Sequence, residues 1–322
     1  MATSGTYSWN LSRDDMIIRA YQEINVYSKD ETISNVTTGD LNFAIYKLNG
    51  MLKVWGLDGI KISKRRRAYL FPALNISSYD LGSISGSAHC TNTYVSTTLT
   101  AAAATNDTVL TVTSTTGMSV SDFVGIELTS GTRQWTTIVS VDSDTQITIT
   151  TGLTSAAAST NTIVTYTAKI NCPLDIIYGS TLDLKSNNNE IECSPLSHDQ
   201  YWKLPIKSTP GRPNNLYYDA VLNGSIPHSK KLYLYPTPSN VYQIIAFVYI
   251  DQIQDMTGST NDLDLPQEWE YPVVFNLAAE MAYSLGKFTE LEKIQPKADK
   301  FYELLKRASS DKTPLRFKIG KN

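Results

Sequence analysis

The chain has 322 residues and a formal net charge of −3, and only 18% of its residues are charged. With 19 Tyr, 8 Phe and 5 Trp it can bury a substantial core, which excludes a disordered polypeptide. The slightly negative charge gives no long-range attraction to nucleic acid or to an anionic membrane, which excludes a general DNA-binding protein.

Cysteine usage and hydropathy give two further expectations. Cys90, Cys172 and Cys193 are widely spaced and form no Cys-x-x-Cys pair, so we expect reduced thiols rather than a disulfide framework. We expect no signal peptide, because no basic region followed by an apolar run opens the sequence. We also expect no membrane partner, because no apolar stretch reaches the length of a membrane span.

Two amphipathic helices are predicted in the first sixty residues. Ser12 and Asp15 have the spacing of a helix cap with an acidic third position. Apolar residues follow on one helical face: Ile17, Ala20, Tyr21 and Ile24. A second helix is expected to open at Thr38 and to end at Gly56 in a left-handed cap. Its apolar stripe comprises Leu41, Ile45, Leu48, Leu52 and Trp55.

Residues 97–168 have a character of their own within a β-rich middle region. Threonine, serine and alanine dominate, and polar and apolar residues alternate between turn signals such as Gly117 and Gly131. This pattern predicts a compact antiparallel insertion, a small barrel or sandwich. Further on, Lys231–Tyr235 and Tyr242–Ile250 are separated by prolines, which predicts a hairpin-type pair.

Two more helices are predicted after residue 265. The first is expected to start at Pro266 and to be broken or restarted at Pro272, with Gly286 ending its apolar face. The second is expected to open with a capping box at Thr289 and to kink at Pro296.

These predictions define an α+β fold. Because an amphipathic helix must bury its apolar stripe, we expect the two helix pairs to pack together as a helical bundle, with the β-rich region and its inserted domain between them. The predicted segments are the N-terminal helix pair 1–62, a β segment 63–96, the inserted β domain 97–168, the β-rich middle region 169–258, the C-terminal helix pair 259–310 and an extended tail 311–322.

Motifs that carry chemistry are missing from the sequence. There is no Walker loop, no G-x-G-x-x-G and no G-x-S-x-G elbow. His89, His198 and His228 do not form the close ligand pairs of a zinc site. Glu190, Glu192 or Asp199 could be drawn as a carboxylate pair, but such pairs occur in almost any protein. We therefore expect no metal, no cofactor and no enzymatic activity.

Two basic segments each admit two interpretations. The run Lys64, Arg65, Arg66 and Arg67 either contacts DNA phosphate or an acidic partner, or is a solvated strand start. The second segment, 312–321, alternates basic and apolar residues. It is either an extended segment that docks on a partner or a frayed terminus.

Several motifs, in this order along the chain, resemble the head-to-tail adaptor proteins of podovirus-type bacteriophages, also called tail accessory or packaged-DNA stabilisation proteins. The resemblance is loose at each motif, covers both ends and much of the middle, and includes no catalytic residue. The motifs are Leu48–Gly56, Pro195–Trp202, Gly211–Pro213, Tyr217–Asp219, Leu234–Pro236, Asp264–Trp269 and Leu277–Tyr283.

The resemblance implies a structural virion protein of the neck, assembled in the host cytoplasm. Such proteins form a ring, typically of twelve subunits, that docks on the portal protein and receives the tail hub or nozzle, while double-stranded DNA passes through without sequence-specific binding. The residues expected to dock on the portal are Lys312, Leu315, Arg316, Phe317, Lys318 and Ile319. Those expected to make subunit contacts are Ile17, Tyr21, Leu48, Leu52, Trp55 and Trp269.

Three alternatives remain open. The first is another tail component, such as a tail terminator or hub adaptor. The second is a virion-associated cell-wall hydrolase, although the sequence suggests no catalytic pair for it. The third is a glycan-binding module in the threonine-rich insertion, with Trp135, Tyr94 and Tyr166 as the aromatic candidates.

Overall fold

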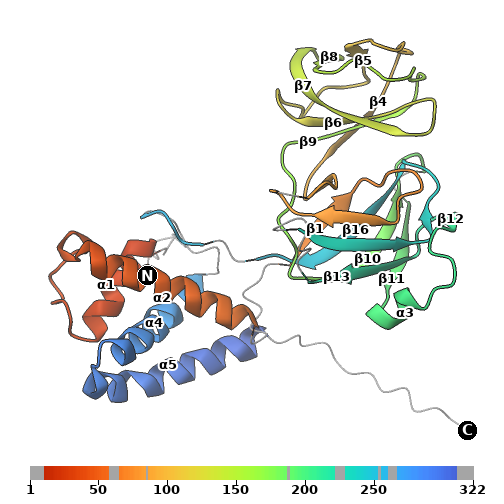
Figure 1. Cartoon of the computed structure of the whole chain (residues 1–322). Coiled ribbons are helices and arrows are strands. Elements are labelled where there is room, and N and C mark those ends of the chain that lie inside the picture. Colours follow the sequence, from red (N-terminus) through yellow and green to blue (C-terminus); the bar gives the residue numbers. More distant parts are fainter. Residues whose placement is uncertain are drawn as a thin grey trace, which may run out of the picture. The chain divides into compact units, whose positions relative to one another are not determined.

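The protein is a mixed α+β chain with about 28% helix and 32% strand, as the sequence predicts. It divides into a helical unit, residues 1–64 and 253–322, and a β unit, residues 65–252 (Figure 1). The computed structural model describes residues 11–57, 65–84, 86–186, 189–221, 229–252, 255–259 and 267–309.

The helical unit is built from four helices that share one hydrophobic core. Helix α4 contacts α1, α2 and α5, and its buried residues include Val273, Leu277 and Met281. The elements are α1 (Arg13–Glu23), the 3-10 turn η1 (Ile33–Asn35), α2 (Thr38–Leu57), the 3-10 turn η2 (Gln267–Trp269), α4 (Glu270–Ser284) and α5 (Phe288–Ser309).

The ends of the first two helices follow local side-chain chemistry. The capping box at Ser12 is confirmed, because its hydroxyl accepts from the Asp15 amide and the Asp15 carboxylate accepts from the Ser12 amide. At α2 the cap is Thr37, whose hydroxyl accepts from the Asp40 amide at 3.2 Å. The prediction that Gly56 ends this helix was wrong, because α2 continues through it. One helical glycine costs only about 1 kcal/mol, and burial of the neighbouring Trp55 outweighs it.

The prolines of the last two helices interrupt neither of them. Pro272 lies in the first turn of α4, where its missing N–H would have had no intrahelical partner. Pro296 lies inside α5, which continues through it as one helix. The capping box predicted at Thr289 was wrong, because α5 begins one residue earlier, at Phe288. The end of α4 is as predicted, with Gly286 at a φ of +69°.

The β unit contains an eight-stranded sheet in the order β2-β14-β13-β11-β10-β16-β1-β3. The sheet curls, so that the Ala88 amide, just before one edge strand, donates to the carbonyl of Asp80 in the other. Its inner face buries Leu70, Leu232 and Phe247. Its strands are β1 (Arg65–Leu70), β2 (Ser78–Leu81), β3 (Cys90–Thr91), β10 (Asp175–Asp183), β11 (Asn189–Pro195), β13 (Asn215–Asp219), β14 (Lys230–Tyr235) and β16 (Gln243–Ile250).

The hairpin predicted from β14 and β16 was wrong. Strand β14 pairs with β13 and β2, whereas β16 pairs with β10 and β1. The chain between them forms β15 (Thr237–Pro238), which pairs with β12 (Pro210–Gly211). Strand β16 is apolar on both faces, and a central position covered on both sides suits that pattern.

The threonine-rich segment forms a six-stranded antiparallel sheet in the order β4-β9-β6-β7-β8-β5. The edge strands are joined by hydrogen bonds of 3.0 Å from the Thr100 amide to Thr111 and from the Thr113 amide to Thr98, so the sheet curls nearly into a barrel. Its strands are β4 (Val95–Thr98), β5 (Val109–Thr111), β6 (Phe123–Glu127), β7 (Arg133–Ser143), β8 (Gln146–Ile149) and β9 (Thr162–Tyr166).

The two sheets of the β unit meet through an aromatic cluster. Phe71 of the larger sheet lies against Trp135 and Tyr166 of the smaller one, with ring centroids 5.5 and 6.0 Å apart. An ion pair adds to this contact, since the buried Glu127 accepts from the ammonium of the partly exposed Lys185 at 2.6 Å. Burial alone would raise the pKa of Glu127, but hydrogen bonds from Lys185 and Thr162 hold that pKa below its usual value.

Two glycine substitutions test this description of the backbone. Gly50 lies inside α2, and a Cβ added there would meet no atom within 4 Å. We expect Gly50→Ala to stabilise the helical unit by about 0.5–1 kcal/mol. Gly131 is equally open but has a φ of +81°, so Gly131→Ala should destabilise the β unit by about 1 kcal/mol. Urea unfolding of each variant measures both effects, and two changes of the same sign would contradict the assignment.

Candidate interaction surfaces

The six residues predicted to make subunit contacts lie in the core of the helical unit itself. Their exposed fractions are between 0 and 8%, so they pack against one another's helices and do not reach a neighbour. As core residues they have almost no surface left for contact with another copy, so such a contact would need exposed residues instead. The buried residues are Ile17, Tyr21, Leu48, Leu52, Trp55 and Trp269.

Helix α2 carries a second apolar stripe on its outer face. Tyr46 and Val54 are 75% and 60% exposed, and Gly50 lies midway between them with open space above its Cα. The spacing i, i+4, i+8 puts the three residues in one row along the helix. The two exposed apolar side chains of this row make the outer face of α2 a candidate interaction surface.

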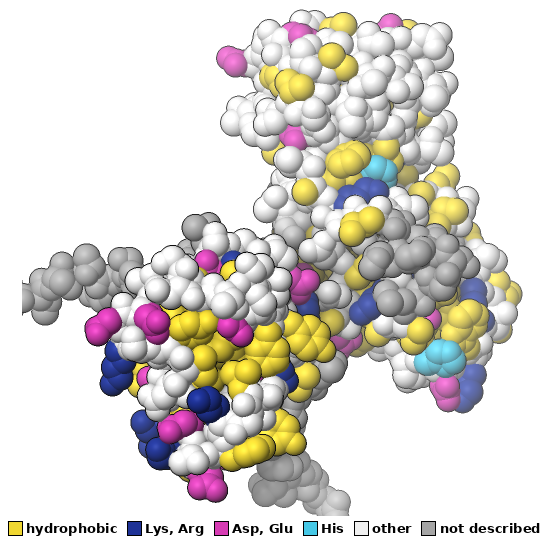
Figure 2. All heavy atoms as spheres, turned by 60° about the vertical axis from the view of Figure 1, so that its left-hand side comes forward, with side chains coloured by type: hydrophobic (Ala, Val, Ile, Leu, Met, Phe, Trp, Pro, Cys, Tyr) yellow, Lys and Arg dark blue, Asp and Glu magenta, His cyan; other side chains and the backbone are white. Residues whose placement is uncertain are grey.

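This stripe borders two adjoining hollows of about 260 and 400 Å³ between α2 and α4. Both are lined by Lys47, Met51, Trp55 and Glu280, and the larger one reaches Tyr283 near the end of α4. We call the two hollows and the stripe the α2 groove. Figure 2 shows one face of the helical unit with a broad hydrophobic area bordered by charged side chains.

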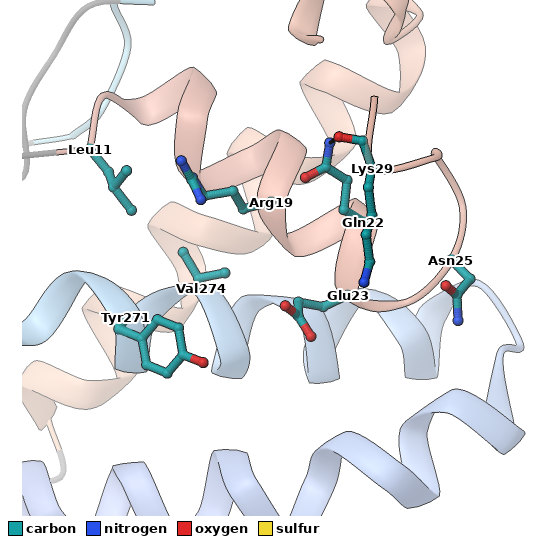
Figure 3. Close-up of a pocket in the computed structure, with 8 residues that line it drawn as sticks. All are labelled: Leu11, Arg19, Gln22, Glu23, Asn25, Lys29, Tyr271 and Val274. Carbon is teal, nitrogen blue, oxygen red and sulfur yellow. Dashed lines mark hydrogen bonds between the residues drawn. The ribbon is translucent and has the colours of Figure 1, made fainter. Parts of the chain in front are cut away.

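A second hollow, of about 470 Å³, lies between α1 and α4. Arg19, Gln22 and Glu23 project from α1, and Tyr271 and Val274 project from α4 (Figure 3). Its remaining lining residues are Leu11, Asn25 and Lys29. It shares no lining residue with the α2 groove. Its mixture of charged and apolar lining residues suits contact with a polar surface of another protein.

The described part of the basic run lies on strand β1 and is engaged in ion pairs. Arg66 Nε lies 3.1 Å from Asp251 Oδ2. Arg67 pairs with Glu190 of β11 and lies over the Tyr69 ring. These partners reduce the positive charge that the run presents to phosphate.

Other predicted residues lie outside the described part of the chain. They are Lys64 of the basic run, His228 and the whole segment 312–319.

The titratable groups of the β unit are used for packing. His89 stacks on Trp135 at 3.7 Å and shares a 2.6 Å hydrogen bond with the Tyr166 hydroxyl. Burial, with the charges of Lys169 and Arg133, lowers the pKa of His89 to about 3, so the ring is neutral near pH 7. Burial likewise raises the pKa of each cysteine thiol. Among the described residues no three His, Cys, Asp or Glu side chains are grouped to hold a metal.

The aromatic residues of the glycan-binding alternative belong to the contact between the two sheets. Tyr166 is 3% exposed, and Trp135 and Tyr94 pack against the same cluster. Side chains that are stacked on other rings do not offer the open platform that a sugar face needs.

The middle motifs of the resemblance meet at one end of the larger sheet. Helix α3 (His198–Trp202) places Tyr201 against Tyr217 and Tyr233, with ring centroids 5.4 and 4.9 Å apart. Trp202 covers the edge of this cluster and remains 48% exposed. No local pattern predicted that these segments would lie together, because their contacts are long-range.

Comparisons with known proteins add no relative. No protein-family model, no curated protein and no solved structure matches the chain. Within the described part of the chain, no helix combines the length and the apolar character that a membrane span requires.

Proposed function

We propose that the chain is a structural virion protein, a head-to-tail adaptor that assembles as a ring on the portal, extends the DNA channel and receives the tail. The observation that carries the proposal is the α2 groove on the surface of the helical unit, where the apolar side chains Tyr46 and Val54 are 75% and 60% exposed. Exposed apolar residues in one row on a helix whose other face is buried support the docking of a partner there.

A closed ring needs head-to-tail contacts between two different surfaces of the same subunit. The α2 groove and the hollow between α1 and α4 are two different surfaces of the helical unit, and each combines charged with apolar lining residues. In this proposal the four helices act as a bundle that forms the body of the ring. The near-neutral net charge suits a channel past which DNA slides without binding.

The segment 312–319 is assigned to the portal in this proposal. A subunit with weak affinity for itself assembles when a ring-shaped template holds many copies close together, because the effective concentration then rises. We therefore expect the isolated chain to be monomeric and the ring to form on the portal.

Size-exclusion chromatography with light scattering, on the chain alone and mixed with the portal protein of the same genome, tests this function. The expected result is a monomer that joins the portal in one large stoichiometric complex. A chain that stays monomeric beside the portal would overturn the adaptor function and would direct the search to tail-side proteins.

A further inference from the structure

The outer face of the larger sheet carries a hollow of about 310 Å³ that extends over strands β1, β16, β10 and β11. Its floor is made of small side chains, because Ala246 of β16 pairs with Ser180 of β10. Glu192 of β11 lies beside Ser180 at the end of this row. Tyr178, two residues before Ser180 on β10, forms a wall and is 55% exposed. We call this feature the sheet hollow.

An arginine of the chain itself crosses the sheet hollow. Arg67 projects from β1, which is separated from β11 by β16 and β10, and it forms an ion pair with Glu190 of β11. The Arg67 guanidinium also lies over the Tyr69 ring, 5.3 Å from the ring centroid. This guanidinium is therefore held by an aromatic ring and a carboxylate together, the combination that suits a planar cation.

A second pair of the same two groups is left open in the sheet hollow. Within the described part of the chain, the Glu192 carboxylate has no hydrogen-bond or ion-pair partner. The exposed ring of Tyr178 lines the same hollow. The charged lining residues are Arg67, Glu190 and Glu192, and because the first two neutralise each other, the hollow keeps one net negative charge. A free carboxylate beside an exposed ring, above a floor of small side chains, fits a flat cation.

We infer that the sheet hollow binds an arginine side chain of a partner protein, whose guanidinium stacks on Tyr178 and pairs with Glu192. Arginine fits better than lysine, because a planar guanidinium can stack on a ring and pair with a carboxylate through two parallel hydrogen bonds. In this arrangement Arg67 serves the site by occupying Glu190, so that Glu192 alone is left for the ligand. The site is independent of the adaptor function, since any partner surface that presents an arginine can supply the ligand.

N-acetyl-arginine amide is a suitable probe, and its binding to the full chain is measured by saturation-transfer difference NMR. We expect saturable binding with a dissociation constant on the order of millimolar, because one ion pair and one stacked ring are its main contacts. N-acetyl-citrulline amide has nearly the same shape without the charge and should not bind. N-acetyl-lysine amide should bind several-fold more weakly than the arginine probe.

Three variants test the residues of the site. Glu192→Gln and Tyr178→Ala should each weaken binding of the arginine probe by about tenfold. Arg67→Gln frees Glu190 and should tighten binding by about threefold, because the hollow then carries a second negative charge. Asp199→Asn is the matched control for a lost charge, since its carboxylate is 77% exposed on α3 outside the hollow, and it should leave binding unchanged. Urea unfolding shows that each variant is folded.

Equal binding of the arginine and citrulline probes overturns the inference, and so does arginine binding that neither Glu192→Gln nor Tyr178→Ala weakens. An equal loss with Asp199→Asn also overturns it, because the probe would then respond only to the net charge of the chain. Equal binding of the arginine and lysine probes contradicts the assignment to arginine. No portal protein enters these measurements, so a chain that fails here can still join the portal, and a chain that does not join the portal can still bind the probe.

Discussion

Leu48→Ala is expected to lower the free energy of unfolding of the helical unit by about 2–5 kcal/mol, whereas Tyr46→Ala should change it by less than about 0.5 kcal/mol. The two residues are two positions apart in α2 and therefore lie on nearly opposite faces, and the exposed fractions of Leu48 and Tyr46 are 0% and 75%. Removing the Leu48 side chain leaves a cavity among α1, α2 and α4, whereas Tyr46 loses only contact with solvent. Urea denaturation followed by circular dichroism measures both values.

For ring assembly, in contrast to stability, we expect the exposed residues of α2 to matter. Tyr46→Asp together with Val54→Asp places two charges on the surface assigned to the neighbouring subunit, so the ring should fail to form while the monomer keeps its stability. Val139→Asp is the matched control, because Val139 is 51% exposed on the smaller sheet. Loss of assembly with the control as well, or normal assembly with the double variant, would remove the α2 groove from the ring contact.

The β unit is expected to lose about 1–2 kcal/mol of stability through His89 alone when the pH falls from 7.5 to 5. In the folded chain the pKa of His89 is lowered to about 3 by burial and by Lys169 and Arg133, whereas the unfolded chain has the ordinary value near 6.5. Between these values the unfolded state binds the extra proton. The stability is therefore fully present above about pH 6.5 and is lost as the pH falls toward the folded pKa.

His89→Phe removes this titration, so the stability of the variant should fall by about 1–2 kcal/mol less between pH 7.5 and 5. The Tyr166 hydroxyl also loses its hydrogen-bond partner, but it does so at every pH. Urea unfolding at pH 7.5 and 5 gives the slope for each protein. The control is His198→Gln, which removes a histidine whose side chain is 69% exposed on α3. A His89 ring proton that titrates near pH 6.5 by NMR would show that the ring is not held neutral.

Local features of the helices could be predicted from the sequence. The cap at Ser12 and the end of α4 at Gly286 depend on neighbouring residues, and both are present in the structure. The predictions at Gly56 and Pro272 failed for an energetic reason. Each assumed that a helix-breaking residue decides the boundary, whereas a glycine costs little within a packed helix and a proline costs nothing in a first turn.

The strand pairing could not be predicted in the same way. The chain from β14 to β16 suggested a hairpin because the strands are neighbours in sequence. In the sheet they are separated by β13, β11 and β10, which enter from elsewhere in the sequence. Such pairing depends on which strands can bury both faces, and no local signal contains that information.

The candidate interaction surface on α2 could be predicted only in part from the sequence. The stripe of Leu48, Leu52 and Trp55 was the stronger apolar signal, and stronger apolar stripes become cores. The signal for the surface was the second row, Tyr46 and Val54 with Gly50 between them. Helix α2 carries apolar residues on two faces, whereas packing in its own core uses only one of them.

Native mass spectrometry of the portal before and after addition of the chain tests the adaptor function most directly. We expect the portal to gain a complete ring in one cooperative step, with no populated intermediates, and the Tyr46→Asp and Val54→Asp variant to add only isolated subunits. A portal whose mass does not change, or that binds scattered single copies of the unaltered chain, would contradict the account.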